Sequence, residues 1–162
     1  MLKLFSRKSS ILEVKAPFDG KVIPIEEVKD DVFAQLMMGD GLAIIPEDGK
    51  VYSPLDGVIS AVATTNHALG ITSDDGIELI VHYGIDTVKY NGEGFRMLVK
   101  QDQKVKAGDL LLEVDMDYFT SKGVDLTSPV LVTNKDEYEI VEKTALNSSV
   151  RHGDLLYTVK KK

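Results

Sequence analysis

The sequence predicts an all-β fold, an antiparallel sandwich or barrel. Short runs rich in Val, Ile and Leu, roughly five to eight residues long, recur along the chain, and such runs are typical of β-strands. Adjacent Asp and Gly residues separate them, and this pairing favours tight turns. The turn signals occur at 19–20, 40–41, 48–49, 56–57, 75–76, 108–109 and 153–154.

Helices are expected only as one or two short pieces, because the chain carries no long amphipathic pattern of period 3.6. The first piece covers 31–37, with Asp30 or Asp31 as its N-cap. The second covers 93–99, and 116–122 is a third possibility.

Two internal repeats indicate a duplicated architecture. APFDGKVI at 16–23 resembles SPLDGVI at 53–59, and VKAGDLL at 105–111 resembles VRHGDLL at 150–156. Each unit is interpreted as a turn that leads into a strand. Because each occurs twice, the expected fold has two similar sheet layers on one core, of the type called a duplicated barrel-sandwich hybrid.

The 162 residues suffice for one domain, predicted over 14–162 behind a flexible N-terminal tail at 1–13. A net charge of −7 disfavours nucleic acid and favours a basic partner protein. The chain has no cysteine, which excludes disulfides and thiolate chemistry. It also has neither a recognisable signal peptide nor the roughly 20 apolar residues that a membrane helix needs. We therefore expect a cytoplasmic protein without stable membrane insertion.

His82 is the first candidate functional residue. Strand alternation places Ile77, Leu79 and Val81 on a core face and directs His82 outward beside Ile80. Gly84 permits a sharp bend that brings a backbone carbonyl to the imidazole. A carbonyl that accepts from Nδ1–H leaves Nε2 as a nucleophile near neutral pH.

His67 lies in a polar link between two strand-like runs, where the Thr65 hydroxyl can orient its ring. Sequence spacing alone does not show that His67 and His82 meet. His152 aligns with Ala107 in the second repeat, so we interpret it as an ordinary surface residue.

A family resemblance rests on NHA at 66–68, VHYGIDT at 81–87 and GEGF at 92–95. VFA at 32–34, GDG at 39–41, SPV at 128–130 and Asn134 also fit. In order and spacing, the chain resembles the glucose-specific IIA proteins of the bacterial phosphoenolpyruvate-dependent sugar phosphotransferase system. The resemblance implies a phosphotransferase component that works without a cofactor.

The same resemblance implies roles for individual residues. It makes His82 the residue phosphorylated on Nε2 and His67 the neighbour that hydrogen-bonds the phosphoryl group. Thr65 would orient His67, and the Gly84 carbonyl would hold Nδ1 of His82.

Docking roles and partners are implied as well. Asp30 and Asp86 would flank the site, and the apolar side chains of Phe33 and Ile80 suit partner docking. The expected donor is phospho-HPr and the expected acceptor is a IIB domain of a glucose-family permease. Some relatives also bind regulated permeases or kinases.

Three other classes of protein compete with this interpretation. A zinc hydrolase of related barrel fold is suggested by His82 and Asp86, but such enzymes need a His-x-His motif that is absent here. Zinc held by His67, His82 and a partner's carboxylate remains an alternative interface role. A biotinyl or lipoyl carrier needs a modified lysine in a context that the sequence lacks. The third class is a non-catalytic regulatory binding protein.

Overall fold

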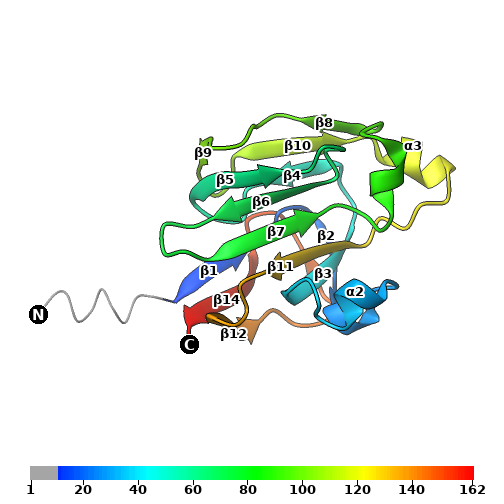
Figure 1. Ribbon diagram of the computed structural model, residues 1–162. Helices are drawn as coiled ribbons and strands as arrows, with labels where there is room; N and C mark the ends of the chain where they lie inside the picture. The colour runs from blue at the N-terminus through cyan, green and yellow to red at the C-terminus, as the bar shows by residue number, and fades with distance from the viewer. Residues whose placement is uncertain (1–10) are drawn as a thin grey trace, which may run out of the picture.

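The computed structural model describes residues 11–162 and confirms an all-β fold built from antiparallel strands (Figure 1). One sheet has eight strands and two sheets have three strands each. The large sheet contains, in spatial order, β13 (Ser149–Val150), β2 (Gly20–Pro24), β3 (Asp40–Pro46), β11 (Ser128–Val132), β7 (Glu78–His82), β6 (Ala68–Thr72), β5 (Gly57–Val62) and β9 (Lys104–Val105). The small sheets contain β1 (Leu12–Lys15), β14 (Leu155–Lys161) and β12 (Tyr138–Lys143), and β4 (Lys50–Tyr52), β10 (Leu110–Val114) and β8 (Phe95–Met97).

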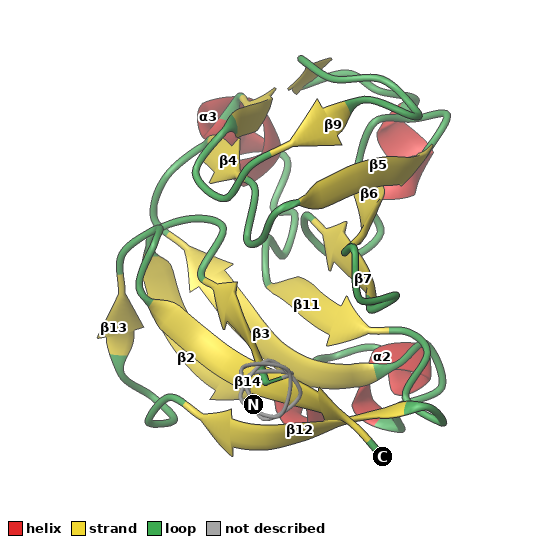
Figure 2. Ribbon diagram, turned by 90° about the vertical axis from the view of Figure 1, so that its left-hand side faces the viewer, coloured by secondary structure: helices red, strands yellow, loops and turns green. Residues whose placement is uncertain are grey.

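The strand order of the large sheet shows the predicted duplication. From one end the order is β13, β2, β3, β11, and from the other end it is the equivalent set β9, β5, β6, β7. In Figure 2 these two halves lie one above the other, with β5, β6 and β7 above β2, β3 and β11. Reciprocal backbone bonds join the halves: Lys15 N–H donates to the Pro54 carbonyl at 2.8 Å, and Tyr52 N–H donates to the Pro17 carbonyl at 2.7 Å.

The repeated turns also make equivalent side-chain bonds. The carboxylate of Asp19 accepts from the backbone N–H of His152 at 2.8 Å, and that of Asp56 accepts from Ala107 N–H at 2.8 Å. Each Asp-Gly turn is therefore hydrogen-bonded to a Gly-Asp turn from a distant part of the chain. The recurrence of the Asp-Gly and Gly-Asp turns in the two repeats thus has a structural reason.

The main core lies between the sheets. Phe18 and Tyr83 are fully buried there, with their ring centroids 5.3 Å apart in an edge-on arrangement. Burying one large apolar side chain contributes about 1.5–3 kcal/mol to folding. A second cluster lies on the outer face of the large sheet, beneath the segment that joins β2 to β3. It contains Ile23, Ile25, Val28, Phe33, Ala43, Ile85 and Leu131.

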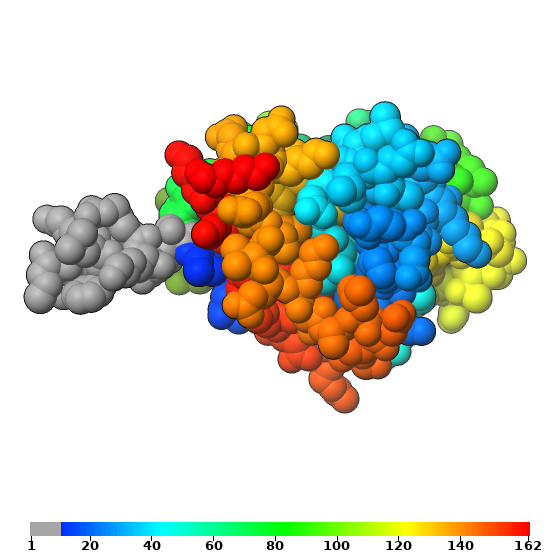
Figure 3. All heavy atoms as spheres, turned by 90° about the horizontal axis from the view of Figure 1, so that it is seen from below, coloured from blue at the N-terminus to red at the C-terminus, as the bar shows by residue number. Residues whose placement is uncertain are grey.

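Two of the three predicted helical pieces exist, and both are capped by aspartate. The helix α2 (Asp31–Ala34) follows η1, a 3₁₀ turn (Ile25–Glu27), and the Asp30 side chain accepts from its first turn. The helix α3 (Met116–Ser121) is capped in the same way by Asp115. Seen from below, the segment that contains α2, blue to cyan, lies beside the orange region of β12 (Figure 3).

The helix predicted over 93–99 is wrong, because this segment contains the strand β8, which pairs with β10. Gly94 adopts φ +85°, a left-handed conformation that cannot continue a helix, and an ideal Cβ there would lie 2.6 Å from the Phe119 ring. Phe95 then packs against Phe119, with ring centroids 5.0 Å apart. A second 3₁₀ turn, η2 (Thr87–Tyr90), precedes this segment.

An N-terminal tail was predicted over 1–13, and residues 1–10 of it lie outside the described residues. Its last part differs from the expectation, since Leu12 and Glu13 pair with β14 as members of β1.

The hydrogen bonds of Asp19 and Asp56 between these turns give a first prediction. Replacing Asp19 or Asp56 by Ala should each destabilise the protein by about 0.5–1.5 kcal/mol, because each removes one hydrogen bond to a backbone N–H. Urea denaturation of the two single variants and the double variant measures this, with Asp74→Ala as a control for losing an exposed turn carboxylate. A large cost for one turn and none for the other would contradict their equivalence.

Candidate functional site

His82 is the last residue of β7, and its side chain lies on the outward face of the strand, as the alternation predicted. Leu79 and Val81 are buried in the core, whereas Ile80 and His82 lie half-buried on the opposite face. Nδ1 of His82 lies 2.8 Å from the Gly84 carbonyl oxygen. Since a carbonyl only accepts, Nδ1 carries the proton and Nε2 keeps its lone pair.

The bend at Gly84 creates this contact. Gly84 has φ +83°, and an ideal Cβ would lie 2.5 Å from Cγ2 of Thr87 and 3.3 Å from Cδ2 of Leu126. Its backbone N–H donates to Oγ of Ser128 at 3.0 Å. The Thr87 hydroxyl donates to the Tyr83 carbonyl at 2.7 Å and closes the loop.

His67 meets His82 in the folded chain. The two ring centroids are 4.8 Å apart and the ring planes are 75° to each other. His67 belongs to the tight link between β5 and β6, and its carbonyl accepts from the Tyr83 N–H at 2.8 Å. The Thr65 hydroxyl lies 2.6 Å from Nδ1 of His67. The structure thus brings together both predicted histidines and the predicted orienting threonine.

The helix α2 forms another wall of the site. Its Phe33 ring lies edge-on to His82, with centroids 4.9 Å apart. Asp30, the N-cap of α2, is close enough for its charge to act on the imidazole of His82. Phe33 and Asp30 are therefore both neighbours of His82, in line with the places expected for them.

Burial keeps both imidazoles neutral. It is the largest cause that lowers the pKa of His82 to about 4, and the nearby His67 acts in the same direction. The bond to the Gly84 carbonyl and the charge of Asp30 oppose this shift. Burial also lowers the pKa of His67 from its ordinary value of 6.5. At neutral pH the site holds two uncharged imidazoles.

Ile80 lines an apolar hollow of about 490 Å³ on the outer face of β5, β6 and β7. Ala61, Ala68 and Gly70 also line it. Ala68 is the strand partner of His82, so the hollow adjoins the site. An apolar surface beside reactive groups is a typical docking area.

Asp86 differs from Asp30 in its surroundings. It is exposed at the start of η2 and lines a hollow of about 310 Å³ together with Lys29, Lys89 and Lys122. Among the described residues, no hydrogen bond joins the Asp86 carboxylate to His82, and its charge is not among those that act on the pKa of His82. The three lysines that line the same hollow reduce the negative potential there.

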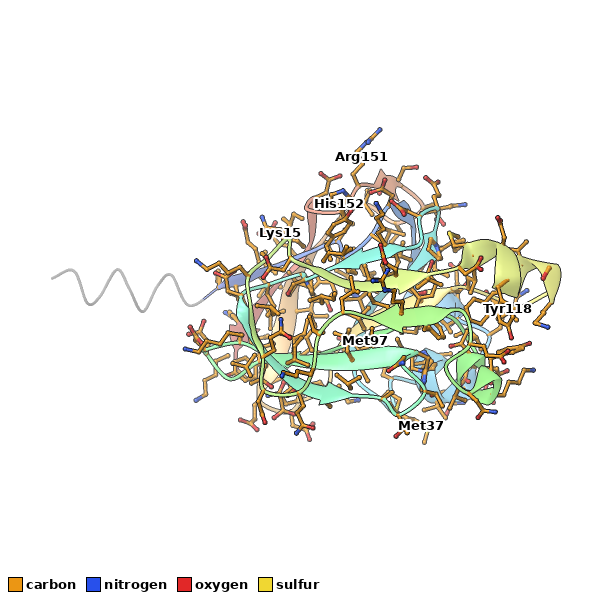
Figure 4. All side chains as sticks on the ribbon, turned by 90° about the horizontal axis from the view of Figure 1, so that it is seen from above. Lys15, Met37, Met97, Tyr118, Arg151 and His152 are labelled. Carbon is orange, nitrogen blue, oxygen red and sulfur yellow. The ribbon has the colours of Figure 1, made fainter. Side chains whose placement is uncertain are left out.

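His152 lies away from the site, as the repeats indicated. Its ring stacks on Tyr52, with centroids 4.1 Å apart. Figure 4 shows it beside Arg151, across the molecule from Met37, which follows α2.

Across residues 11–162, no three or more His, Cys, Asp or Glu side chains form a group able to hold a metal ion. No helix within this range is long and apolar enough to cross a membrane.

Ser128 is the site residue that sequence reasoning did not single out. It occurs in the SPV string at 128–130, but nothing in the sequence connects its hydroxyl to Gly84, 44 positions earlier. The contact depends on the pairing of β11 with β7, which brings the two segments together.

The sequence and the fold match one known class of protein. A model of the family described as "phosphoenolpyruvate-dependent sugar phosphotransferase system, EIIA 1" matches residues 12–138, and the chain belongs to this family. It is therefore a phosphotransferase component of that system.

Two individual comparisons agree with this assignment. The chain is similar to the "PTS system glucose-specific EIICBA component" of Staphylococcus saprophyticus, at 45% identity over 82% of this chain. That match spans 20% of the relative's length. The structure is similar to that of glucose permease IIA from Mycoplasma capricolum, with a TM-score of 0.82 and 38% identity, over 91% of this chain and 95% of that one.

The burial of His82 predicts its behaviour with pH. Its ring should titrate with a midpoint near pH 4, and the free energy of unfolding should fall between pH 6.5 and about 4. The unfolded chain takes up this proton at a higher pH than the folded chain, so acid favours unfolding in this window. Imidazole ¹⁵N shifts followed against pH measure the midpoint. His82→Gln should remove part of the acid sensitivity, and a midpoint at or above 6.5 would contradict the prediction.

The bend at Gly84 gives a third prediction. Gly84→Ala should destabilise the protein by about 1–3 kcal/mol, because a Cβ at this positive φ is strained and contacts Thr87. Gly108→Ala is the matched control, since Gly108 has φ +93° but no atom within 4 Å of an ideal Cβ. Denaturant unfolding of both variants separates backbone strain from the clash. Equal losses would show that the contact with Thr87 has no cost.

Proposed function

We propose that this protein is a phosphohistidine carrier, which accepts a phosphoryl group from phospho-HPr on Nε2 of His82 and passes it to a IIB domain. The observation that carries the proposal is the 2.8 Å bond from Nδ1 of His82 to the Gly84 carbonyl, with His67 beside the ring. This bond leaves Nε2 as the only ring nitrogen with a free lone pair.

The transfer step needs positioning and hydrogen bonding more than covalent work by the scaffold. The Nε2 lone pair attacks phosphorus, the new N–P bond forms, and the N–P bond of the donor's phosphohistidine breaks. The electron pair of that broken bond returns to the donor's imidazole. No redox change or cofactor is required.

His67 has the geometry of a phosphoryl stabiliser. When the Thr65 hydroxyl donates to Nδ1, the proton of neutral His67 resides on Nε2. That N–H then serves as a donor to the phosphoryl oxygens as the group crosses between the two proteins. Thr65 therefore acts by holding the His67 ring at Nδ1, which leaves Nε2 for the phosphoryl group.

The surroundings of the site suit a protein partner. Ile80 and Phe33 lie beside His82. Val32 of α2 and Met37 just after it are exposed apolar side chains of the same segment as Phe33, with 42% and 67% of their surfaces accessible. Asp30 adds a carboxylate that attracts a basic partner. Asp86 contributes less to this attraction, because Lys29, Lys89 and Lys122 share its hollow.

The partners belong to the same proposal. The similar relative is by its name glucose-specific, so a IIB domain of a glucose-family permease is the proposed acceptor. The protein would work in the cytoplasm, where its donor is recharged from phosphoenolpyruvate.

A phosphoryl-transfer assay tests the function. The protein is mixed with phosphoenolpyruvate, enzyme I and HPr, and the acid-labile phosphate is located by mass spectrometry. Wild type should gain one phosphate on His82, and His82→Ala should gain none. His67→Ala should still be phosphorylated but pass the group to a IIB domain roughly 100-fold more slowly, the usual effect of losing one such donor.

His152→Ala is the control and should behave as wild type, because His152 lies on another face. A wild-type protein that takes up no phosphate from phospho-HPr would refute the carrier proposal. Phosphate found on His67 would reverse the assigned roles.

A further inference from the structure

A two-step hydrogen-bond chain lies behind the bend that holds His82. The Gly84 N–H donates to Oγ of Ser128 at 3.0 Å, and the Ser128 hydroxyl donates to the Leu126 carbonyl at 2.7 Å. Ser128 is the first residue of β11 and is fully buried. Its side chain therefore has no water to replace either partner.

The direction of this chain is fixed. A backbone N–H only donates and a backbone carbonyl only accepts, so the Ser128 hydroxyl must point its proton at Leu126 and its lone pair at Gly84. Only one arrangement satisfies all three groups. Ser128 thus holds the N–H side of the peptide between Tyr83 and Gly84, whose carbonyl side accepts from the Thr87 hydroxyl.

The neighbouring amides of the loop have other acceptors. Tyr83 N–H donates to the His67 carbonyl, and Ile85 N–H donates to the Asp125 carbonyl, each at 2.8 Å. Gly84 between them has the Ser128 hydroxyl. The peptide that carries the Gly84 carbonyl also holds the Ile85 N–H, which is bonded to Asp125, and the Tyr83 carbonyl accepts from Thr87. Loss of the Ser128 bond therefore frees the Gly84 N–H alone, but glycine lacks the Cβ that would limit the resulting rotation. Rotation of its backbone would carry the Gly84 carbonyl away from Nδ1 of His82.

We propose that Ser128 is a positioning residue for phosphoryl transfer, which fixes the Nδ1–H tautomer of His82 by holding Gly84 in place. This role rests on the proposed function of His82. Ser128 acts through Gly84: its hydroxyl accepts from the Gly84 N–H, and it is the Gly84 carbonyl that bonds to Nδ1 of His82.

A matched serine elsewhere separates positioning from general stability. Ser73 is also buried, and its Oγ accepts from the backbone N–H of Ile77 at 3.1 Å. It lies in the turn between β6 and β7, at the opposite end of β7 from His82. Ser73→Ala therefore removes a similar bond without touching the bend.

The experiment reads the tautomer of His82 directly. Imidazole ¹⁵N spectra of the unphosphorylated protein should show wild type and Ser73→Ala with Nδ1 protonated and Nε2 free. Ser128→Ala should show the two nitrogens shifted toward each other as both tautomers become populated. Its rate of phosphoryl uptake from phospho-HPr should fall between about 10- and 100-fold, by analogy with the loss of a hydrogen-bond partner behind a metal-binding histidine.

Ser128→Thr keeps the hydroxyl and should restore both the spectrum and the rate. If Ser128→Ala does not fold, Ser128→Cys replaces it, because a sulfur of similar size is only a weak acceptor. The wild-type spectrum and rate in Ser128→Ala, or in Ser128→Cys where that variant replaces it, would overturn the proposal, and so would an equal change in Ser73→Ala. The spectra need no phosphoryl donor, so a protein that takes up no phosphate would refute the proposed function while the tautomer still tests Ser128.

Discussion

The site depends on one constraint: the chain has to leave the sheet immediately after His82. Had β7 continued, Gly84 would lie on the same face as His82, with its carbonyl directed at a neighbouring strand. Instead its positive φ turns the carbonyl back onto the imidazole. The intervening Tyr83 buries its side chain in the core and bonds its N–H to His67. A single reversal of three residues thus sets the tautomer of one histidine and the position of the other.

The two halves of the duplicated fold differ in the length of one connection, and this difference exposes the surface beside the two histidines. β7 and β11 are equivalent central strands, and Leu131 pairs with Ile80 across them. The long link between β2 and β3 carries η1 and α2, which cover Leu131 and bury it completely. The equivalent link between β5 and β6 covers only 63–67 and leaves Ile80 partly exposed. The short link places His67 at the edge of this open half, so the histidine pair and the apolar hollow lie together.

The sequence predicted those features that depend on residues close together in the chain. Alternation gave the outward direction of His82, and the Asp-Gly repeats gave the duplicated turns, because both depend on residues close in sequence. The failed helix at 93–99 shows tertiary packing of Phe95 overriding propensity. The pairing of His67 with His82 and the lysines around Asp86 depend on contacts between distant segments. Only the family resemblance pointed to the histidine pair, and it gave no role for Ser128.

If His82 carries a phosphoryl group, as proposed, the electrostatics of the site favour passing that group onward over retaining it. The charges that act on the pKa of His82 come from His67 and Asp30, and no Lys or Arg of the described chain is among them. A phosphoryl group on Nε2 would meet a neutral N–H donor and a carboxylate in a largely buried place. Without a cation to form a strong ion pair, and with Asp30 repelling it, the bound group stays high in energy. A neutral donor helps transfer in either direction, because it stabilises the group in transit without trapping it on this protein. The lowered pKa values fit this proposal in two ways: a positively charged His67 would hold the phosphoryl group more tightly, and a protonated His82 would have no Nε2 lone pair to accept it.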